Sequence, residues 1–311
     1  MTITIIVPCY NEDDVLKTSD SELRSILLQM ENSNLVSDNS FILYVDDGSN
    51  DKTWDIIKSL ALKYKEVKGI KLSHNRGHQN ALLAGLEYCV NKCDASITID
   101  ADLQDDIKLI PEMVNHYKSG ADVICGVRDN RNSDSWFKRN SAHFFYKIMQ
   151  FLGVNCIYNH ADFRLLSNRA MRDLLAYDER NIFLRGIIPE LGYNQQQIKY
   201  TRTPRKQGYT KYPLKKMVEF AIDGITSFSV KPVRMLFWIG CLFIFLAIAI
   251  GIYSLIRYSS GDTVVGWTSL ILSIWFCTGI ILICMGILGE YIGKIYIEVK
   301  HRPRYFIEQE V

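Results

Sequence analysis

The sequence predicts an α/β domain with a mostly parallel, Rossmann-like sheet, followed by an amphipathic segment and two membrane-spanning helices. Two observations lead to this fold class. Over residues 1–212, short β-branched apolar runs alternate with amphipathic helical patterns. Two uncharged segments of 22 residues then follow each other near the C-terminus. A net charge of +2 gives no indication of nucleic-acid binding, and eight cysteines without a Cys-x-x-Cys pair indicate reduced thiols in a cytosolic setting.

Strands are expected where short apolar runs stop at turn-forming or acidic residues. These runs are residues 3–7, 41–45, 67–72 and 95–99. Between them, apolar residues recur at three- and four-residue steps over residues 53–64 and 78–90, which predicts helices. Buried strands that alternate with helices form mostly parallel sheets with right-handed crossovers.

Polar residues directly follow three of these predicted strands. They are Pro-Cys-Tyr-Asn-Glu at 8–12, Asp-Asp-Gly-Ser at 46–49 and Asp-Ala-Asp-Leu-Gln-Asp at 100–105. In open parallel sheets ligands bind beyond the carboxyl ends of the strands, so the three clusters are expected to converge on one site. Taken alone, residues 46–49 are equally well explained as a turn with a helix N-cap, and a short acidic run is commonly just solvated.

The acidic run offers hard oxygen ligands at one strand end. Asp100 and Asp102 supply carboxylates, and Gln104 supplies an amide oxygen. This set suits Mg²⁺ or Mn²⁺, which take oxygen ligands and keep positions open for substrate phosphates. We expect the cation to bridge the two phosphates of a nucleotide diphosphate, with Asp102 and Gln104 as direct ligands and Asp100 shared between metal and ribose.

Residues 235–256 and 267–288 each reach the ~20 residues that a helix needs to cross ~30 Å of hydrocarbon. The short link between them predicts an antiparallel hairpin within residues 232–291, against the alternative of buried core helices. Lys and Arg flank the pair on both outer sides, whereas the link carries only Arg257. By the positive-inside rule, we expect a multi-pass cell-membrane protein with its N-terminal domain and its tail, residues 292–311, in the cytoplasm.

Residues 213–231 are amphipathic, which is typical of a juxtamembrane helix in the membrane interface, although a core helix of the soluble domain fits nearly as well. In the second span, Gly279, Gly286 and Gly289 would permit close helix contacts and so a homo-oligomer.

Cationic residues gather in two stretches, around Arg128 and Arg139 and again between Arg205 and Lys211. Basic residues next to a membrane can simply attract anionic head groups. The alternative is a specific phosphate clamp, for which the planar fork of arginine is suited. A phosphate bound at the membrane surface would belong to a lipid.

These motifs, in this order, resemble the family 2 glycosyltransferases, and within them the polyprenyl-phosphate glycosyltransferases, which include bactoprenol glucosyltransferases and dolichyl-phosphate mannose synthase. The resemblance covers essentially the whole chain, through residues 8–12, 45–49, 75–78, 100–105, 162–165, 205–212, 223–229 and 289–293. Two departures leave the sugar open: residues 106–108 are Asp-Ile-Lys where many relatives have Pro-Pro-Glu, and Thr210 replaces a common Ser.

The resemblance implies a GT-A domain that uses a nucleotide sugar, with uridine the expected base, and Mg²⁺ or Mn²⁺. The acceptor it implies is polyprenyl phosphate, held in the membrane lipid. Nucleotide-binding roles then fall to Pro8, Tyr10, Glu12, Asp47 and Gly77. The metal and the diphosphate would be bound by Asp100, Asp102 and Gln104. The phosphates of acceptor and donor would be bound by Arg128, Arg139, Arg205 and Lys211.

The acceptor's chemistry predicts the mechanism. A phosphate monoester has its second pKa near ~6, so at neutral pH it is already a charged nucleophile that needs little general-base help. We expect a single in-line displacement with inversion at the anomeric carbon. Asp162 is a candidate base or orienting residue, and a structural salt bridge with Arg164 or Arg139 is the alternative.

Two rival functions stay open at this point. One is a membrane transferase with a hydroxyl acceptor, although the Gln-x-x-Arg-Trp motif of processive relatives is absent from the sequence. The other is a catalytically silent membrane scaffold, which the intact acidic run disfavours. Glucose, N-acetylglucosamine and galactose all remain candidates for the sugar.

Overall fold

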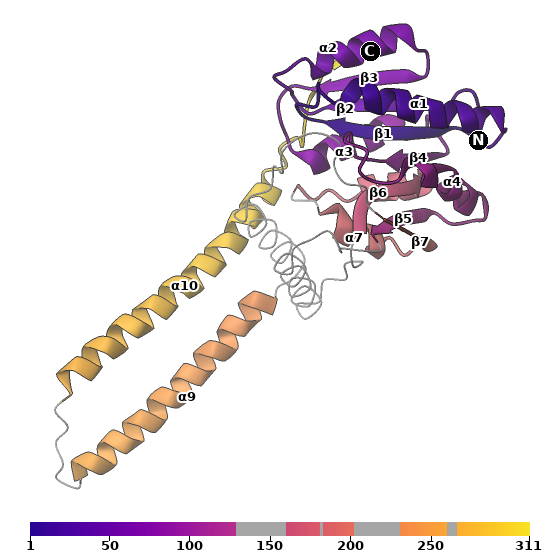
Figure 1. Ribbon diagram of the computed structural model, residues 1–311. Coiled ribbons are helices and arrows are strands. Elements are labelled where there is room, and N and C mark those ends of the chain that lie inside the picture. Colours follow the sequence, from indigo (N-terminus) through magenta and orange to yellow (C-terminus); the bar gives the residue numbers. More distant parts are fainter. Residues whose placement is uncertain (129–159, 181–182, 202–230, 260–265) are drawn as a thin grey trace.

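The computed structural model describes residues 1–128, 160–180, 183–201, 231–259 and 266–311. Figure 1 shows a sheet-based domain from which two long helices extend. The strands are β1 (Ile3–Cys9), β2 (Phe41–Asp46), β3 (Val67–Leu72), β4 (Ala95–Thr98), β5 (Val123–Arg128), β6 (His160–Ser167), β7 (Gln195–Tyr200) and β8 (Ile307–Glu310). The helices are α1 (Leu16–Asn32), α2 (Thr53–Lys63), α3 (His78–Cys89), α4 (Ile110–Lys118), α6 (Asn168–Leu175), α7 (Leu184–Glu190), α9 (Lys231–Ser259) and α10 (Trp267–Val299), with a 3-10 turn, η1, at Ile107–Leu109.

One sheet contains all eight strands, in the order β7-β5-β6-β4-β1-β2-β3-β8. Strands β4, β1, β2 and β3 are parallel neighbours, and β5 and β7 also pair in parallel. Strand β6 runs antiparallel between β4 and β5, and β8 runs antiparallel along β3. The mostly parallel α/β fold is therefore confirmed, and each of the four predicted strands ends within two residues of its expected position.

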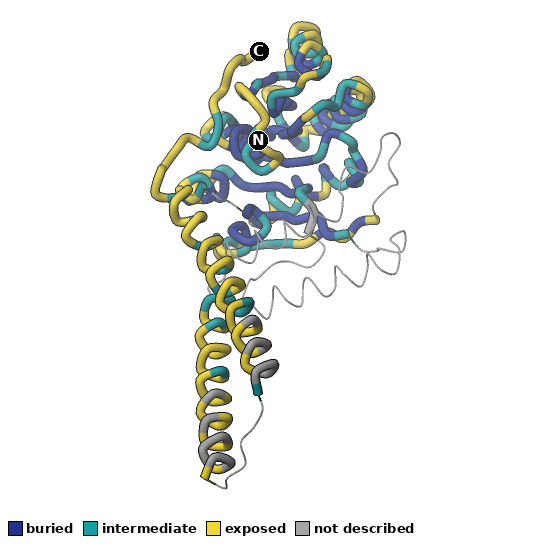
Figure 2. The backbone as a smooth tube through the Cα atoms, turned by 90° about the vertical axis from the view of Figure 1, so that its left-hand side faces the viewer, coloured by how far each residue is buried: buried dark blue, intermediate teal, exposed yellow. Residues whose placement is uncertain are grey.

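The central strands of the sheet are buried on both faces. Every residue of β1 and β2 is buried, as expected for strands that are covered by helices on either side. Ile5 of β1 belongs to the apolar cluster that includes residues of α1, α2 and α4, whereas its neighbour Ile6 belongs to the cluster that includes residues of α3, α6 and α7. Figure 2 shows this buried layer through the centre of the domain. Because both faces are covered by helices, a ligand can reach the sheet only at its ends. The polar loops lie at the carboxyl ends of the strands.

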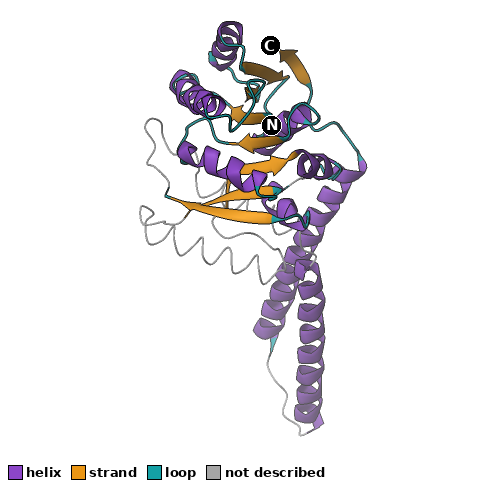
Figure 3. Ribbon diagram, turned by 90° about the vertical axis from the view of Figure 1, so that its right-hand side faces the viewer, coloured by secondary structure: helices purple, strands orange, loops and turns teal. Residues whose placement is uncertain are grey.

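Helices α9 and α10 lie side by side and stand away from the domain (Figures 1 and 3). Their apolar side chains are largely exposed, with Phe245 at 69% and Ile283 at 65%. Both helices are long and apolar enough to cross a membrane. Each is longer than the predicted span, because α9 begins at Lys231 and α10 continues to Val299. The predicted amphipathic helix lies outside the described residues, apart from its last residue.

The C-terminal tail differs from its prediction as a separate segment that starts at residue 292. Residues 292–299 belong to α10, and β8 joins the sheet of the N-terminal domain as its edge strand. Gly69 and Val311 exchange two backbone hydrogen bonds of 2.8 and 2.9 Å. The Trp54 indole nitrogen donates to Gln309 Oε1 at 2.8 Å, and the Tyr88 hydroxyl donates to Glu310 Oε1 at 2.6 Å. The chain that follows α10 therefore returns to the domain and joins its sheet.

Removing residues 307–311 is expected to destabilise the domain by about 2–6 kcal/mol, because four hydrogen bonds worth ~0.5–1.5 kcal/mol each are lost and the edge of β3 is exposed. Chemical unfolding of the detergent-solubilised chain measures this. Glu308→Gln is the matched control in the same strand. It breaks only the 3.0 Å ion pair with Lys71, at 43% and 22% side-chain exposure, and should cost less than about 1 kcal/mol. Equal stability of the truncated and full-length chains would contradict a structural role for β8.

Candidate active site at the carboxyl end of the sheet

The three predicted polar clusters meet at one edge of the sheet. They follow β4, β1 and β2, which are adjacent and parallel. The backbone N–H of Asp47 donates to the carbonyl of Cys9 at 2.9 Å, and that of Asn11 donates to Ser49 Oγ at 3.0 Å. These contacts join the clusters after β1 and β2, and the pairing of β4 with β1 places the start of the acidic run at the same edge.

Asp47 holds the loop between β3 and α3. Its buried carboxylate accepts the backbone N–H of Arg76 at 2.7 Å and that of Gly77 at 2.8 Å. Burial raises the pKa of Asp47, and these two N–H groups only partly oppose it. Gly48, at φ +68°, lies so close to His74 that a Cβ atom would come within 2.5 Å of that residue's carbonyl carbon. The loops after β2 and β3 are therefore locked together, and Gly77 begins α3 at φ 87°.

The loop after β1 is built on a left-handed residue. Asn11 has φ 53°, a conformation that Asn adopts more readily than most residues. The backbone N–H of Glu12 donates to Thr53 Oγ1 at 2.9 Å, which ties this loop to the start of α2. Pro8 lies within β1, and Tyr10 is 40% exposed just beyond it. An exposed aromatic ring at this edge can stack on a base.

The acidic run folds into a tight turn after β4. Leu103 has φ 43°, which reverses the chain and lets the backbone N–H of Gln104 approach Asp102 Oδ1 at 3.3 Å. Asp100 Oδ1 lies 2.9 Å from His78 Nε2, at the first residue of α3. Burial alone would lower the pKa of His78, but its hydrogen bond with Asp100 and that residue's charge outweigh burial and raise it. The same pair lowers the pKa of Asp100 against its own burial.

Asp105 closes the run in a buried polar cluster. Its Oδ1 accepts from the Tyr200 hydroxyl and, at 3.3 Å, from Arg128 Nη2. Arg128 Nε also lies 3.3 Å from the Tyr200 hydroxyl. Arg128, one of the predicted phosphate ligands, thus has its guanidinium oriented by two residues at this end of the sheet, with 24% of its side chain exposed.

The chemistry of the acidic run fits a hard divalent cation. Asp100 and Asp102 present carboxylates at one strand end. Gln104 is only 8% exposed, so the two carboxylates are the more accessible metal ligands. Within the described ranges, no three His, Cys, Asp or Glu side chains are close enough to hold a metal by themselves. Two carboxylates suit Mg²⁺ or Mn²⁺, which commonly complete their coordination with substrate phosphates and water.

Asp162, on β6, is held between two arginines. Arg164 Nη2 donates to its Oδ1, and Arg185 Nη2 donates to its Oδ2 at 2.9 Å. Burial would raise the pKa of Asp162, but the charges of Arg185 and Arg164 outweigh it and hold that pKa well below its usual range. The salt bridge with Arg164 is the predicted structural alternative, whereas Arg139 lies outside the described residues.

Sequence reasoning missed the roles of His78 and Arg185. His78 begins the predicted helix that follows β3, so its place after a strand and a glycine was an available signal. Arg185 had none, because it lies in a seven-residue helix that contains Pro189. The backbone N–H of Leu184 donates to Gln79 Oε1 at 2.9 Å, and this contact fixes α7 against α3.

Three further predicted phosphate ligands, Arg139, Arg205 and Lys211, lie outside the part of the chain that the structure describes. Their roles stay predictions.

Known proteins share both parts of this architecture. Residues 4–175 match the glycosyl transferase family 2 model, and residues 231–295 match the GtrB C-terminal hairpin. The uncharacterized glycosyltransferase YkoT of Bacillus subtilis is 47% identical over 306 residues, which cover 98% of this chain and 91% of that protein. Bactoprenol glucosyl transferase of Shigella phage SfV is 36% identical over 312 residues, 100% and 99% of the two chains. A prophage bactoprenol glucosyl transferase homolog of Escherichia coli K12 is also 36% identical, over 99% of both chains. The chain belongs to glycosyl transferase family 2 through its sheet domain, and its apolar helix pair matches the GtrB C-terminal hairpin.

Proposed function

We propose that this protein transfers a sugar from a nucleotide sugar to polyprenyl phosphate at the membrane surface. One observation carries the proposal: a family 2 domain and an apolar helix hairpin occur in one chain, and the chain matches bactoprenol glucosyl transferase at 36% identity from end to end. The product would be a lipid-linked sugar for modification of cell-surface glycans. Donors linked to uridine, with glucose or an N-acetylhexosamine as the sugar, are the first to test.

The loops after β1 and β2 are proposed to bind the nucleotide. Tyr10 is exposed for stacking on the base, and Glu12 lies on the loop that Thr53 anchors. Asp47 fixes the adjoining loop through Arg76 and Gly77, so its contribution is to shape the pocket as well as to contact the ligand.

Asp100 and Asp102 are proposed to hold Mg²⁺ or Mn²⁺, and Gln104 is proposed as a further, less exposed ligand. The bound cation would neutralise the charge that develops on the leaving diphosphate. His78 hydrogen-bonds one oxygen of Asp100 and fixes how its carboxylate is turned. This support from α3 favours a preorganised site over a loose acidic loop.

The acceptor requires no strong base. Its phosphate is already ionised at neutral pH, since its second pKa is near ~6. The lowered pKa of Asp162 makes this carboxylate a weak base, which favours an orienting role for it. Asp162 would hold Arg185, whose side chain is 32% exposed, toward the reacting phosphates. These features support a single displacement with inversion, in which the residues position the reactants and stabilise charge.

The membrane part is proposed to keep the acceptor close. Helices α9 and α10 would cross the bilayer, and the excess of Lys and Arg outside the link favours a cytoplasmic catalytic domain. A polyprenyl chain dissolved in that bilayer would present its phosphate at the same surface. Contact through the glycines of α10 would allow a homo-oligomer.

Radiolabelled donors test the proposal directly. Membranes that contain the chain are incubated with undecaprenyl phosphate and Mg²⁺ or Mn²⁺. The labelled donor is UDP-glucose, UDP-N-acetylglucosamine or UDP-galactose. We expect label in the organic phase that is released by mild acid, and none when a chelator is present. Label on a phosphate-free lipid would instead favour a hydroxyl acceptor. No transfer from any nucleotide sugar would refute the proposal.

A further inference from the structure

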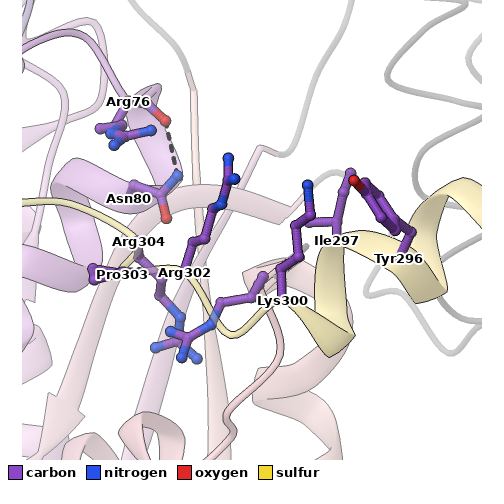
Figure 4. Close-up of a pocket in the computed structure, with 9 residues that line it drawn as sticks. Arg76, Asn80, Tyr296, Ile297, Lys300, Arg302, Pro303 and Arg304 are labelled. Atoms are coloured by element: carbon purple, nitrogen blue, oxygen red, sulfur yellow. Dashed lines mark hydrogen bonds between the residues drawn. The ribbon is translucent and has the colours of Figure 1, made fainter.

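A basic pocket lies where the end of α10 meets the catalytic domain, with a cavity volume of about 400 Å³. One wall comes from the loop before α3 and the start of that helix, and the other from the end of α10 and the residues that follow it (Figure 4). Its polar lining residues are Arg76, Asn80, Arg180, Lys300, Arg302 and Arg304. Five of these six side chains are cationic, so the pocket concentrates positive charge in a confined space.

Most of this positive charge is not neutralised. Within the described part of the chain, no carboxylate lies within ion-pair distance of Arg76, Lys300 or Arg302. Arg180 has only a 3.5 Å contact with Asp178, whose side chain is 76% exposed. Like charges gathered without counter-charges repel one another, so an anion in the pocket would be strongly favoured.

Arg304 adds to this charge without a carboxylate of its own. Its guanidinium donates to the backbone carbonyls of Tyr177 and, at 3.2 Å, of Glu179. Both oxygens of Glu298 accept the backbone N–H of Arg180, at 2.9 and 2.8 Å. The pocket walls are thereby fixed to each other while the charge remains.

Unsatisfied buried atoms point to the same conclusion. Arg76 Nε, Arg180 Nε and Asn80 Oδ1 are buried and have no hydrogen-bond partner among the residues that the structure describes. A buried polar atom left in this state costs about 1–3 kcal/mol. Two of the three atoms are guanidinium donors, and the third is an amide oxygen that can only accept. The amide nitrogen of the same residue, Asn80 Nδ2, already donates to the carbonyl of Arg76 at 2.8 Å. A ligand that both accepts and donates, such as a phosphate with a hydroxyl, would satisfy all three.

We propose that this pocket is a binding site for a phosphate-bearing anion, and its lining includes none of the residues assigned above to the nucleotide, the metal or the acceptor. Arginine forks match phosphate oxygens in pairs, and Lys300, stacked 3.9 Å above the Tyr296 ring, adds a point charge. The phosphate can come from a soluble ester or from the head group of a membrane lipid. Lys300 directly follows Phe276–Val299, the apolar stretch of α10 that is long enough to cross a membrane, so the pocket would lie at the bilayer surface.

Phosphate binding to the full chain tests the site. The chain, in detergent with a chelator present, is titrated with inorganic phosphate against chloride at equal ionic strength, and the rise in melting temperature is recorded. The double variant Lys300→Gln/Arg302→Gln should bind phosphate at least tenfold more weakly than the wild type. Lys118→Gln/Arg172→Gln, on exposed positions of α4 and α6, is the matched control and should retain wild-type affinity. Circular dichroism verifies that both variants are folded.

Nanodiscs distinguish the two sources of phosphate. If the ligand is a lipid head group, phosphatidylglycerol discs should weaken binding of inorganic phosphate several-fold relative to phosphatidylcholine discs, and the Lys300→Gln/Arg302→Gln variant should lack this competition. Equal phosphate affinity in both discs assigns the site to a soluble phosphate ester. Either result supports the site. Equal phosphate affinity in the wild type and the pocket variant, in detergent, would overturn it whether or not the chain transfers sugar.

Discussion

Replacing Asp102 with Asn is expected to lower sugar transfer by ~100-fold or more, which corresponds to about 2.7 kcal/mol of transition-state stabilisation. The substitution keeps the size of the side chain and removes one of the two accessible carboxylates at the end of β4. A weaker cation site would leave the leaving diphosphate poorly neutralised. Turnover with saturating nucleotide sugar and metal measures the loss.

The matched control lies four residues along the same run. Asp106 accepts the backbone N–H of Lys108 at 3.1 Å and caps η1. Asn caps helices as well as Asp does, so Asp106→Asn should leave both folding and turnover near wild type. If Asp102→Asn turned over like the wild type with metal present, the proposed role of this carboxylate would be wrong.

The strands that carry the site could be predicted because their sequences strongly favour buried β-strands. Residues 3–7 and 41–45 are apolar, β-branched or aromatic throughout, and each is followed by a proline or by two aspartates. Such runs form strands buried on both faces, and their parallel pairing brings the following loops together. The convergence of the three polar clusters followed from that rule before any contact was known.

The C-terminal strand could not be predicted in this way. Strand β8 has the sequence Ile-Glu-Gln-Glu and is exposed throughout, so it carries no apolar pattern. It forms because the edge of β3 offers unpaired backbone groups. The extension of α10 was missed for a related reason. Hydropathy finds the part of a helix that fits hydrocarbon, whereas α10 continues through Glu290, Lys294 and Glu298.

The charged network around Asp162 was predictable only in part. Asp162 and Arg164 are two residues apart on one strand, so their side chains share a face of the sheet. Arg185 reaches the same carboxylate from α7, 23 residues away. Only the packing of α7 against α3 brings it there, through the hydrogen bond between Leu184 and Gln79. Contacts made by short helices of this kind leave no periodic signal in the sequence.

Replacing Asp162 with Asn is expected to destabilise the domain by about 3–5 kcal/mol, the range for removing one partner of a buried ion pair. The reason is Arg164, which is 1% exposed and whose Nε and Nη1 already lack hydrogen-bond partners in the described part of the chain. Losing Asp162 would leave that guanidinium buried with no strong counter-charge. Urea unfolding at neutral pH measures the loss. Asp122→Asn is the matched control, and its loss should be smaller because its partner Arg169 is 64% exposed.

The pH dependence of stability should change in the same variant. The folded-state pKa of Asp162 lies well below its usual range, because Arg185 and Arg164 outweigh burial. Its stabilising effect is therefore complete above the unfolded-state pKa, at about pH 4, and is lost as the pH falls from there through the folded-state value. The wild type should lose stability along this acid limb, and Asp162→Asn should lose less between neutral pH and about pH 3. If both proteins lost the same free energy of unfolding as the pH fell, the two arginines would not be stabilising a charged Asp162. The orienting role proposed for Asp162 would then be wrong.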